Sequence, residues 1–288
     1  MSRIYDALKK LEAERLGRGG NGHKGGGNGG GNGGGNGRNG GNGRNGGNGK
    51  RRGWRRFFGG SGHTEGHAQM ALRLPLDPEA EEAYHRLGTN LLLPAGGEAG
   101  PVPRLLGVTA SRHGEGTTTT AAVFGSILVR RRGGRVAVVE ANRRSPSFDT
   151  VFAIRRDGGF AELIQGTKTL AEVALPTEVP NLFAIGCGHS ELGGPALFDS
   201  PGVGRALDEL RKHFEFVVFD LPPANVYADT SILAPRLDAS LIVIEADCTR
   251  VPEVERTRRS LERVGVKLVG SVLNRRRNYI PAFLEEML

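Results

Sequence analysis

The sequence has few of the features that mark secreted or membrane-spanning proteins. Its 288 residues include only two cysteines, Cys187 and Cys248, which are far apart and show no metal-binding spacing. A disulfide framework is therefore excluded. No stretch approaches eighteen continuous apolar residues, and the charged N-terminus lacks the apolar core of a signal peptide. We expect a cytoplasmic protein whose membrane contact is peripheral, at the inner face of the plasma membrane.

Most of the chain also lacks a charge imbalance, although the formal net charge is +8. Residues 1–70 hold thirteen Lys and Arg against four Asp and Glu, whereas the other 218 residues hold 26 against 27. The excess of cations therefore belongs to an N-terminal arm. We predict three parts: a short helix over residues 1–17, a linker over 18–70 and one globular domain over 71–288.

The first part, residues 1–17, shows helical spacing of apolar residues. Ile4, Ala7, Leu8 and Leu11 follow the order i, i+3, i+4, i+7. Because so short a helix is marginal alone, it needs a surface to dock on. That surface is either its own globular domain or a partner, and the sequence leaves both open.

The linker, residues 18–70, begins with a tract that is almost entirely Gly and Asn, which cannot bury apolar surface and predicts disorder. The stretch from Lys50 to Phe58, KRRGWRRFF, then interleaves five cations with three aromatic rings. Such a pattern suits an anionic membrane surface. Nucleic acid is disfavoured because the globular part adds no basic stripe, and a plain solvated linker is the alternative.

The globular part alternates short apolar runs with helical patterns. This alternation predicts an α/β fold, a doubly wound and mostly parallel sheet with helices on both faces. The expected strands are 105–110, 136–139, 182–185, 216–219, 241–244 and 267–273. The expected helices are 78–93, 118–130, 160–164, 203–212, 230–233 and 253–264.

The first predicted strand leads into a loop with the shape of a P-loop but without its lysine. In the pattern G-x-x-x-x-G-K-[ST], Gly116 and Thr118 are in place, Ser111 replaces the first glycine and Thr117 replaces the lysine. Such a loop wraps phosphate with backbone N–H groups at a helix N-terminus. The candidate nucleotide-binding residues here are Gly114, Glu115, Gly116, Thr117, Thr118 and Thr119.

Two further polar residues come at the ends of apolar strands, where doubly wound sheets bind ligands. Asp220 stands where a Walker B carboxylate would reach Mg²⁺, with Thr118 as the second metal residue. A helix cap is the ordinary alternative for such an aspartate. Asn274, followed by Arg275, could meet an adenine edge. The expected cofactor is ATP or ADP with Mg²⁺.

Together these stretches resemble the bacterial tyrosine autokinases (BY-kinases of the CpsD/CapB type), a branch of the MinD/ParA-like P-loop proteins. The resemblance covers residues 78–288 and the opening MSRIYDALKK. Its motifs are P-G-E-G-K-S at Gly114-Glu115-Gly116, D-A-D at Glu140-Ala141-Asn142, D-x-P-P at Asp220-Leu221-Pro222-Pro223, and LNRRRNYIP at 273–281. The family implies a kinase of capsule and exopolysaccharide synthesis.

The departures from the family pattern fall on charged groups. The loop lysine is Thr117, and the two D-A-D acids are Glu140 and Asn142. The family's oligomerisation motif E-x-x-R-x-x-R reads Glu82, His85 and Gly88, so a ring is not implied. The tyrosine-rich tail is reduced to Tyr279.

These departures predict that nucleotide binding persists while efficient phosphoryl transfer does not. The candidate catalytic residues are Asp220, Glu140 and Arg112. Arg112 falls where the MinD-like branch carries an additional lysine and could restore the missing charge; an exposed loop arginine is the alternative.

The leading functional hypothesis is a degenerate BY-kinase-like protein that binds the cytoplasmic end of a membrane polysaccharide co-polymerase. Nucleotide would then act as a conformational ligand. One rival is an active tyrosine kinase or ATPase of the same pathway. The other is a MinD/ParA-like positioning ATPase that uses the basic stretch at Lys50 to Phe58.

Overall fold

The computed structural model describes residues 78–92, 102–154 and 157–276. The chain separates into two units, one formed by Met1–Ile4 with Ala68–Leu288 and the other by Tyr5–His67. All described residues belong to the first unit. The predictions for the N-terminal helix, the Gly/Asn-rich tract and the basic stretch therefore lie outside the described residues.

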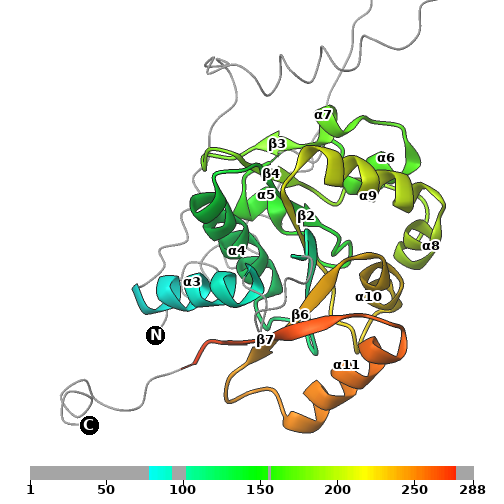
Figure 1. Ribbon diagram of the computed structural model, residues 1–288. Coiled ribbons are helices and arrows are strands. Elements are labelled where there is room, and N and C mark those ends of the chain that lie inside the picture. The colour runs from blue at the N-terminus through cyan, green and yellow to red at the C-terminus, as the bar shows by residue number, and fades with distance from the viewer. Residues whose placement is uncertain (1–77, 93–101, 155–156, 277–288) are drawn as a thin grey trace, which may run out of the picture. The chain divides into compact units, whose positions relative to one another are not determined.

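The described part is built on a seven-stranded sheet in the order β3-β4-β2-β5-β1-β6-β7 (Figure 1). β3 is antiparallel to β4, and every other pairing is parallel. The strands are β1 (Leu105–Ala110), β2 (Val136–Glu140), β3 (Leu175–Pro176), β4 (Leu182–Ile185), β5 (Phe216–Asp220), β6 (Ala239–Glu245) and β7 (Leu268–Asn274). The predicted mostly parallel, doubly wound α/β sheet is confirmed.

Helices alternate with these strands along the chain. They are α3 (Pro78–Leu92), α4 (Thr117–Arg132), α5 (Phe148–Val151), α6 (Phe160–Gln165), α7 (Leu170–Val173), α8 (Gly194–Asp199), α9 (Gly202–His213), α10 (Ala228–Leu233), the 3-10 turn η1 (Ala234–Arg236) and α11 (Val251–Arg263). None of the described helices is long and apolar enough to cross a bilayer.

The central strands are covered on both faces. Every residue of β1, β2, β4 and β5 is buried, as expected for parallel strands between two helical layers. α4 packs along one face, with α3 outside it, while α6 and α9 lie on the other side of the sheet (Figure 1). On that second face, the ring of Phe160 meets Phe219 at 5.6 Å between centroids.

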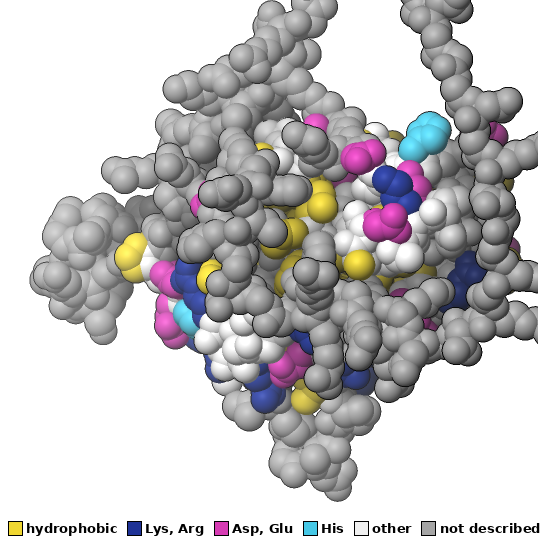
Figure 2. All heavy atoms as spheres, turned by 90° about the horizontal axis from the view of Figure 1, so that it is seen from above, with side chains coloured by type: hydrophobic (Ala, Val, Ile, Leu, Met, Phe, Trp, Pro, Cys, Tyr) yellow, Lys and Arg dark blue, Asp and Glu magenta, His cyan; other side chains and the backbone are white. Residues whose placement is uncertain are grey.

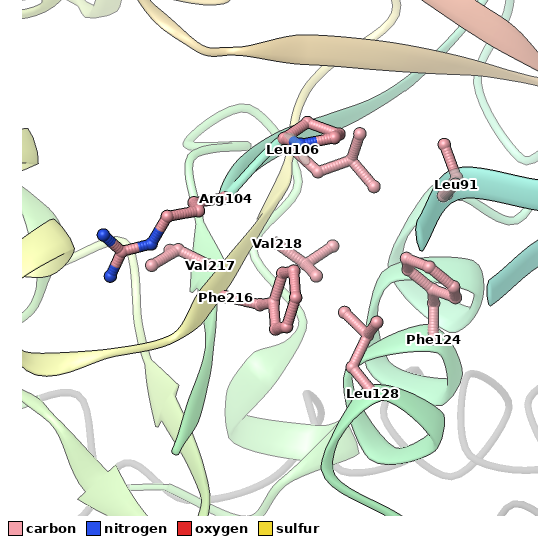
Figure 3. A pocket seen from close by; sticks show the side chains of 9 residues that line it. Leu91, Arg104, Leu106, Phe124, Leu128, Phe216, Val217 and Val218 are labelled. Carbon is pink, nitrogen blue, oxygen red and sulfur yellow. The ribbon is translucent and has the colours of Figure 1, made fainter. Parts of the chain in front are cut away.

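α4 is buried along most of its length because it lies between the sheet and α3. Its residues from Thr120 to Val129 are all buried, and three arginines follow in its last turn before Gly133 ends the helix with a positive φ of 71°. Beside α4, side chains including Phe124, Leu128 and Phe216 line a small, partly open pocket of about 10 Å³ (Figure 3). This space holds about one water.

The strand order brings the candidate loops together. β1 lies between β5 and β6. From β1 the chain crosses to β2 on the far side of β5, and from β5 it crosses back over β1 to β6. This reversal is the switch point at which doubly wound sheets bind ligands. In the β2–β5 ladder, Glu140 is the direct register partner of Asp220. The ends of β1, β2 and β5 therefore form one edge.

Candidate nucleotide-binding site

The loop between β1 and α4 has the backbone geometry of a phosphate-binding loop. Gly114 and Gly116 both have positive φ, 85° and 95°, which favours glycine. A Cβ on Gly116 would also lie 2.2 Å from Nδ2 of Asn274. No side chain caps the N-terminus of α4. The N–H groups of its first turn, residues 117–119, are therefore available to an anion.

Glu115 turns its carboxylate into the loop. Oε2 accepts the N–H of Ser111 at 2.7 Å and of Arg112 at 2.9 Å, and Oε1 accepts the hydroxyl of Thr249. The residue is only 2% exposed. The chain's own anion thus occupies the amides at the start of the loop, and those at the start of α4 are the ones left for a phosphate. A contact between Glu115 and nucleotide remains a prediction, and the backbone of Glu115 would make it, not the carboxylate.

Asn274, at the end of β7, fixes the same loop from the other side. Its Nδ2 donates to the carbonyl of Glu115 at 2.8 Å, and its Oδ1 accepts the N–H of Arg275 at 2.9 Å. The guanidinium of Arg275 reaches Glu245 at 2.8 Å. Asn274 therefore lies at the loop and has a structural role there, whereas the side chain of Arg275 pairs with Glu245 of β6. An adenine contact stays a prediction.

Thr118 and Asp220 meet at the centre of the site. Thr118 Oγ1 donates to Asp220 Oδ2 at 2.6 Å, and Asp220 is completely buried. Burial raises the pKa of the Asp220 carboxyl to about 7; the charge of Glu140 adds to the rise, and the Thr118 hydrogen bond opposes it. Among the described residues, Oδ1 of Asp220 has no hydrogen-bond partner.

This pair fits Mg²⁺, a hard cation that takes oxygen ligands. A threonine hydroxyl and a buried carboxylate with one unsatisfied oxygen are the protein groups that such a site needs when phosphates and waters complete the shell. No cluster of three His, Cys, Asp or Glu suited to a metal occurs in the described ranges.

Glu140 is buried beside this pair, but protein N–H groups surround its carboxylate. Oε1 accepts the N–H groups of Ser147 and of Phe148, the latter at 2.8 Å, and Oε2 accepts that of Cys187 at 3.1 Å. Burial raises the pKa of Glu140, and these bonds oppose the rise. In this arrangement Glu140 holds the loops after β2 and β4. Its catalytic role remains a prediction.

Arg112 points away from this pair. Its side chain is 56% exposed, and its Nη1 lies 3.9 Å from Oε2 of Glu253 on α11. The structure therefore brings together three of the predicted residues, Thr118, Glu140 and Asp220. It places the Arg112 guanidinium at the α11 side of the loop.

A second arginine near the site did not emerge from the sequence as a candidate. Arg144 follows β2; its Nε donates to Asp229 at 3.1 Å and its guanidinium lies 4.8 Å from the ring centroid of Tyr227. Tyr227 in turn meets His113 of the loop at 5.4 Å. Arg144 stands two residues before Pro146 in the sequence, but its partners Asp229 and Tyr227 are distant along the chain and only the fold reveals them.

Known proteins resemble this chain in sequence and in fold. No family model matches the chain. A tyrosine-protein kinase CpsD of Streptococcus pneumoniae serotype 4 is 28% identical over 204 residues, which is 70% of this chain and 87% of the relative. The kinase domain of the Escherichia coli tyrosine kinase ETK superposes with a TM-score of 0.64 at 19% identity, covering 77% of this chain and 88% of that domain.

A third similar structure is the cobyrinic acid a,c-diamide synthase of Mycobacterium smegmatis with bound ADP and magnesium. Its TM-score is 0.51 at 20% identity, covering 59% of this chain and 73% of that one. At these identities the superpositions establish the fold, that of the P-loop kinases and ATPases. The curated relatives are named tyrosine-protein kinases, so the chain is similar to the bacterial tyrosine-kinase family.

Proposed function

We propose that this protein is a nucleotide-binding member of that family in capsule or exopolysaccharide biosynthesis or export, with impaired phosphoryl transfer. The contact that carries the proposal is the Thr118–Asp220 hydrogen bond at 2.6 Å. It keeps the two Mg²⁺ residues together at an uncapped helix N-terminus. When bound, Mg²⁺ would neutralise phosphate charge, and the α4 amides would orient the phosphates.

Binding is expected to survive the loss of the loop lysine. A charge-assisted hydrogen bond contributes about 1.5–3 kcal/mol, or roughly a 10–150-fold change in affinity. An affinity that starts near micromolar would then fall to between tens and hundreds of micromolar, still within reach of cellular nucleotide. The remaining contacts come from the α4 amides and the Thr118–Asp220 pair.

Phosphoryl transfer is expected to suffer more than binding. Removing one preorganised contact to the transition state costs about 10²–10³ in rate. Thr117 carries no charge, and the carboxylate of Glu140 is already held by the N–H groups of Phe148 and Cys187. Both changes act on charge stabilisation rather than on the fold. A role as a conformational regulator follows.

The partner we propose is the cytoplasmic end of a membrane polysaccharide co-polymerase. The basis is the kinship with kinases named CpsD and EpsB. The basic and aromatic stretch at residues 50–58 would add contact with anionic lipid at the inner face of the membrane. Pull-down of the co-polymerase's cytoplasmic segments with and without nucleotide tests this assignment. Equal absence of capture in both conditions contradicts it.

Calorimetry of ATP and ADP binding to the full chain, with and without Mg²⁺, tests the nucleotide proposal. The native chain should bind Mg²⁺–ATP, and Thr117→Lys should bind it more tightly by about 10–150-fold. Absence of binding by both proteins, while both remain folded, would contradict the nucleotide site.

The alternative is an active kinase or ATPase, which the intact Thr118–Asp220 pair favours. Release of phosphate from ATP and phosphotyrosine on the chain or its partner separate the two functions. If the native chain turns over ATP as fast as Thr117→Lys does, the proposal of impaired transfer is wrong.

A further inference from the structure

An open groove of about 950 Å³ lies between α3 and β7, and Tyr84, Leu87 and Val272 in its lining also pack against the apolar core. Tyr84 and Leu87 of α3 and Val272 and Leu273 of β7 contribute apolar surface to it. Figure 1 shows α3 beside β7, the last strand of the sheet. Leu273 is 57% exposed. The groove therefore joins an apolar wall to a sheet edge.

An exposed apolar wall and an unpaired sheet edge are both surfaces that proteins usually cover with another segment. A strand that ends a sheet presents unpaired backbone groups, and an exposed apolar edge promotes aggregation. In the described ranges no strand pairs with the outer side of β7. Where the face in Figure 2 is open to view, hydrophobic side chains lie near its middle and charges of both signs lie around them. We therefore expect another segment to bind in the groove between α3 and β7.

We propose that the C-terminal segment of the same chain, residues 280–288, docks in this groove as an amphipathic helix. Ile280, Phe283, Leu284 and Met287 follow the order i, i+3, i+4, i+7. Pro281 suits the first turn of a helix. Nine residues form too short a helix to be stable alone in water. The segment therefore depends on an apolar surface, and the groove offers one.

Chain length supports this occupant. Arg276 lines the groove, and only three residues separate it from Ile280. Four extended steps span up to about 13 Å, and a nine-residue helix is about 13 Å long. The segment can therefore enter the groove directly from β7. The N-terminal helix predicted at residues 1–17 would have to arrive through a linker of more than fifty residues.

The charges that line the groove are mixed. Arg86 and Arg276 occur there with Glu79 and Glu82, and Nε of Arg86 lies 3.8 Å from Oε1 of Glu82, which leaves Arg276 as the arginine for an incoming carboxylate. On the predicted helix, Glu285 and Glu286 lie on the face opposite to the apolar one. With the apolar face turned inward, these carboxylates would stay at the rim and would pair with Arg276. Exposed pairs of this kind orient a segment more than they stabilise it.

Docking of residues 280–288 would also affect the mobility of the loop between β1 and α4. Asn274 lines the groove and holds the carbonyl of Glu115 at 2.8 Å. A covered β7 would therefore restrict the motion of the loop. This consequence rests on the proposed nucleotide binding, whereas the docking itself does not.

Hydrogen exchange of the full chain tests the docking without nucleotide. Phe283→Asp should raise exchange of the β7 amides by at least about tenfold through local opening. Ala282→Asp is the matched control: it adds the same charge on the polar face and should leave exchange unchanged. Leu273→Asp should reproduce the effect of Phe283→Asp, and the double variant should add little because both disrupt one contact.

Unchanged β7 exchange in Phe283→Asp, with the chain folded, would overturn the proposal. So would protection that is lost on deleting residues 1–17 instead, which would assign the groove to the N-terminal helix. Protection that requires dimer formation, seen as a concentration dependence, would overturn docking within one chain. If β7 opens but ATP binding is absent in every variant, the docking stands and the nucleotide proposal fails.

Discussion

Thr118 donates its hydroxyl hydrogen to Asp220 at 2.6 Å and so ties the first turn of α4 to the end of β5. One oxygen of the carboxylate accepts this bond, while the other has no partner among the described residues. The completely buried carboxyl has a pKa near 7 because burial disfavours its charge. Its protonation state and the binding of a metal are therefore linked.

The first prediction is a pH dependence of Mg²⁺–nucleotide affinity. Mg²⁺ requires the ionised carboxylate, and below pH 7 it must displace the proton of Asp220. Affinity should fall by about tenfold per pH unit below 7 and level off above it. Calorimetry between pH 5.5 and 8.5 measures this, and Asp220→Asn should bind weakly with no such slope. A flat profile in the native chain contradicts the prediction.

The second prediction concerns stability without ligand. The folded-state pKa of Asp220 lies above its ordinary value of 3.8, so the folded chain holds the proton more tightly. The stabilising effect of that proton is present at low pH and is lost as pH rises from about 4 through 7. Asp220→Asn should therefore raise the melting temperature more at pH 8 than at pH 5.5. An equal shift at both pH values would contradict it.

The third prediction separates the shape of Glu115 from its charge. Glu115→Ala leaves the N–H groups of Ser111 and Arg112 without their acceptor, at a cost of about 1–3 kcal/mol each in a buried site. Glu115→Gln keeps an oxygen there. The alanine variant should lose stability and nucleotide affinity in thermal melts and calorimetry, and the glutamine variant should retain most of both. Equal loss in the two variants would assign the role to charge instead.

The sequence predicted the parts of the fold that depend on local patterns. The apolar runs that became β1, β4 and β5 were placed within a residue because buried parallel strands are continuous in Val, Leu and Phe. The Thr118–Asp220 pair was predictable because strand ends converge at one edge of a parallel sheet. Helix ends differ by one or two residues, as with α11, which begins at Val251.

What the sequence could not predict depends on contacts across the chain. α5 and α7 have only four residues each, too few for a periodic signal, and the six-residue α8 was also missed. Asn274 meets the carbonyl of Glu115 across 159 positions, and Arg144 meets Asp229 across 85. Such pairs have no local pattern, because the sheet order alone decides which strand ends are neighbours.

The fourth prediction concerns Arg112, the sequence-based candidate for the missing loop charge. Its exposed side chain lies 3.9 Å from Glu253, and an exposed pair contributes about 0–1 kcal/mol. Arg112→Gln should therefore change ATP affinity and turnover by no more than about fivefold. Glu253→Gln is the control, because it frees the arginine without removing it. A large loss of activity in Arg112→Gln alone would restore Arg112 as a catalytic residue.

The last prediction concerns the opposite ends of the strands, where Asp238 joins the start of β1 to α9. Its carboxylate accepts the N–H groups of Arg104 and Leu105 at 2.8 Å each, and Arg211 binds both of its oxygens. Burial would raise the pKa of Asp238, but the bonds from Arg211 and the two amides outweigh it and lower the pKa.

Because that pKa is depressed in the folded chain, the stabilisation by Asp238 is present above its ordinary pKa and is lost as pH falls through the folded value. Asp238→Asn should lower the melting temperature at pH 7, and the gap to the native chain should narrow in acid below about pH 4. Arg211→Gln is the matched partner, and its effect should overlap with that of Asp238→Asn in the double variant. Full additivity of the two substitutions would mean that the arginine and the aspartate stabilise the fold independently.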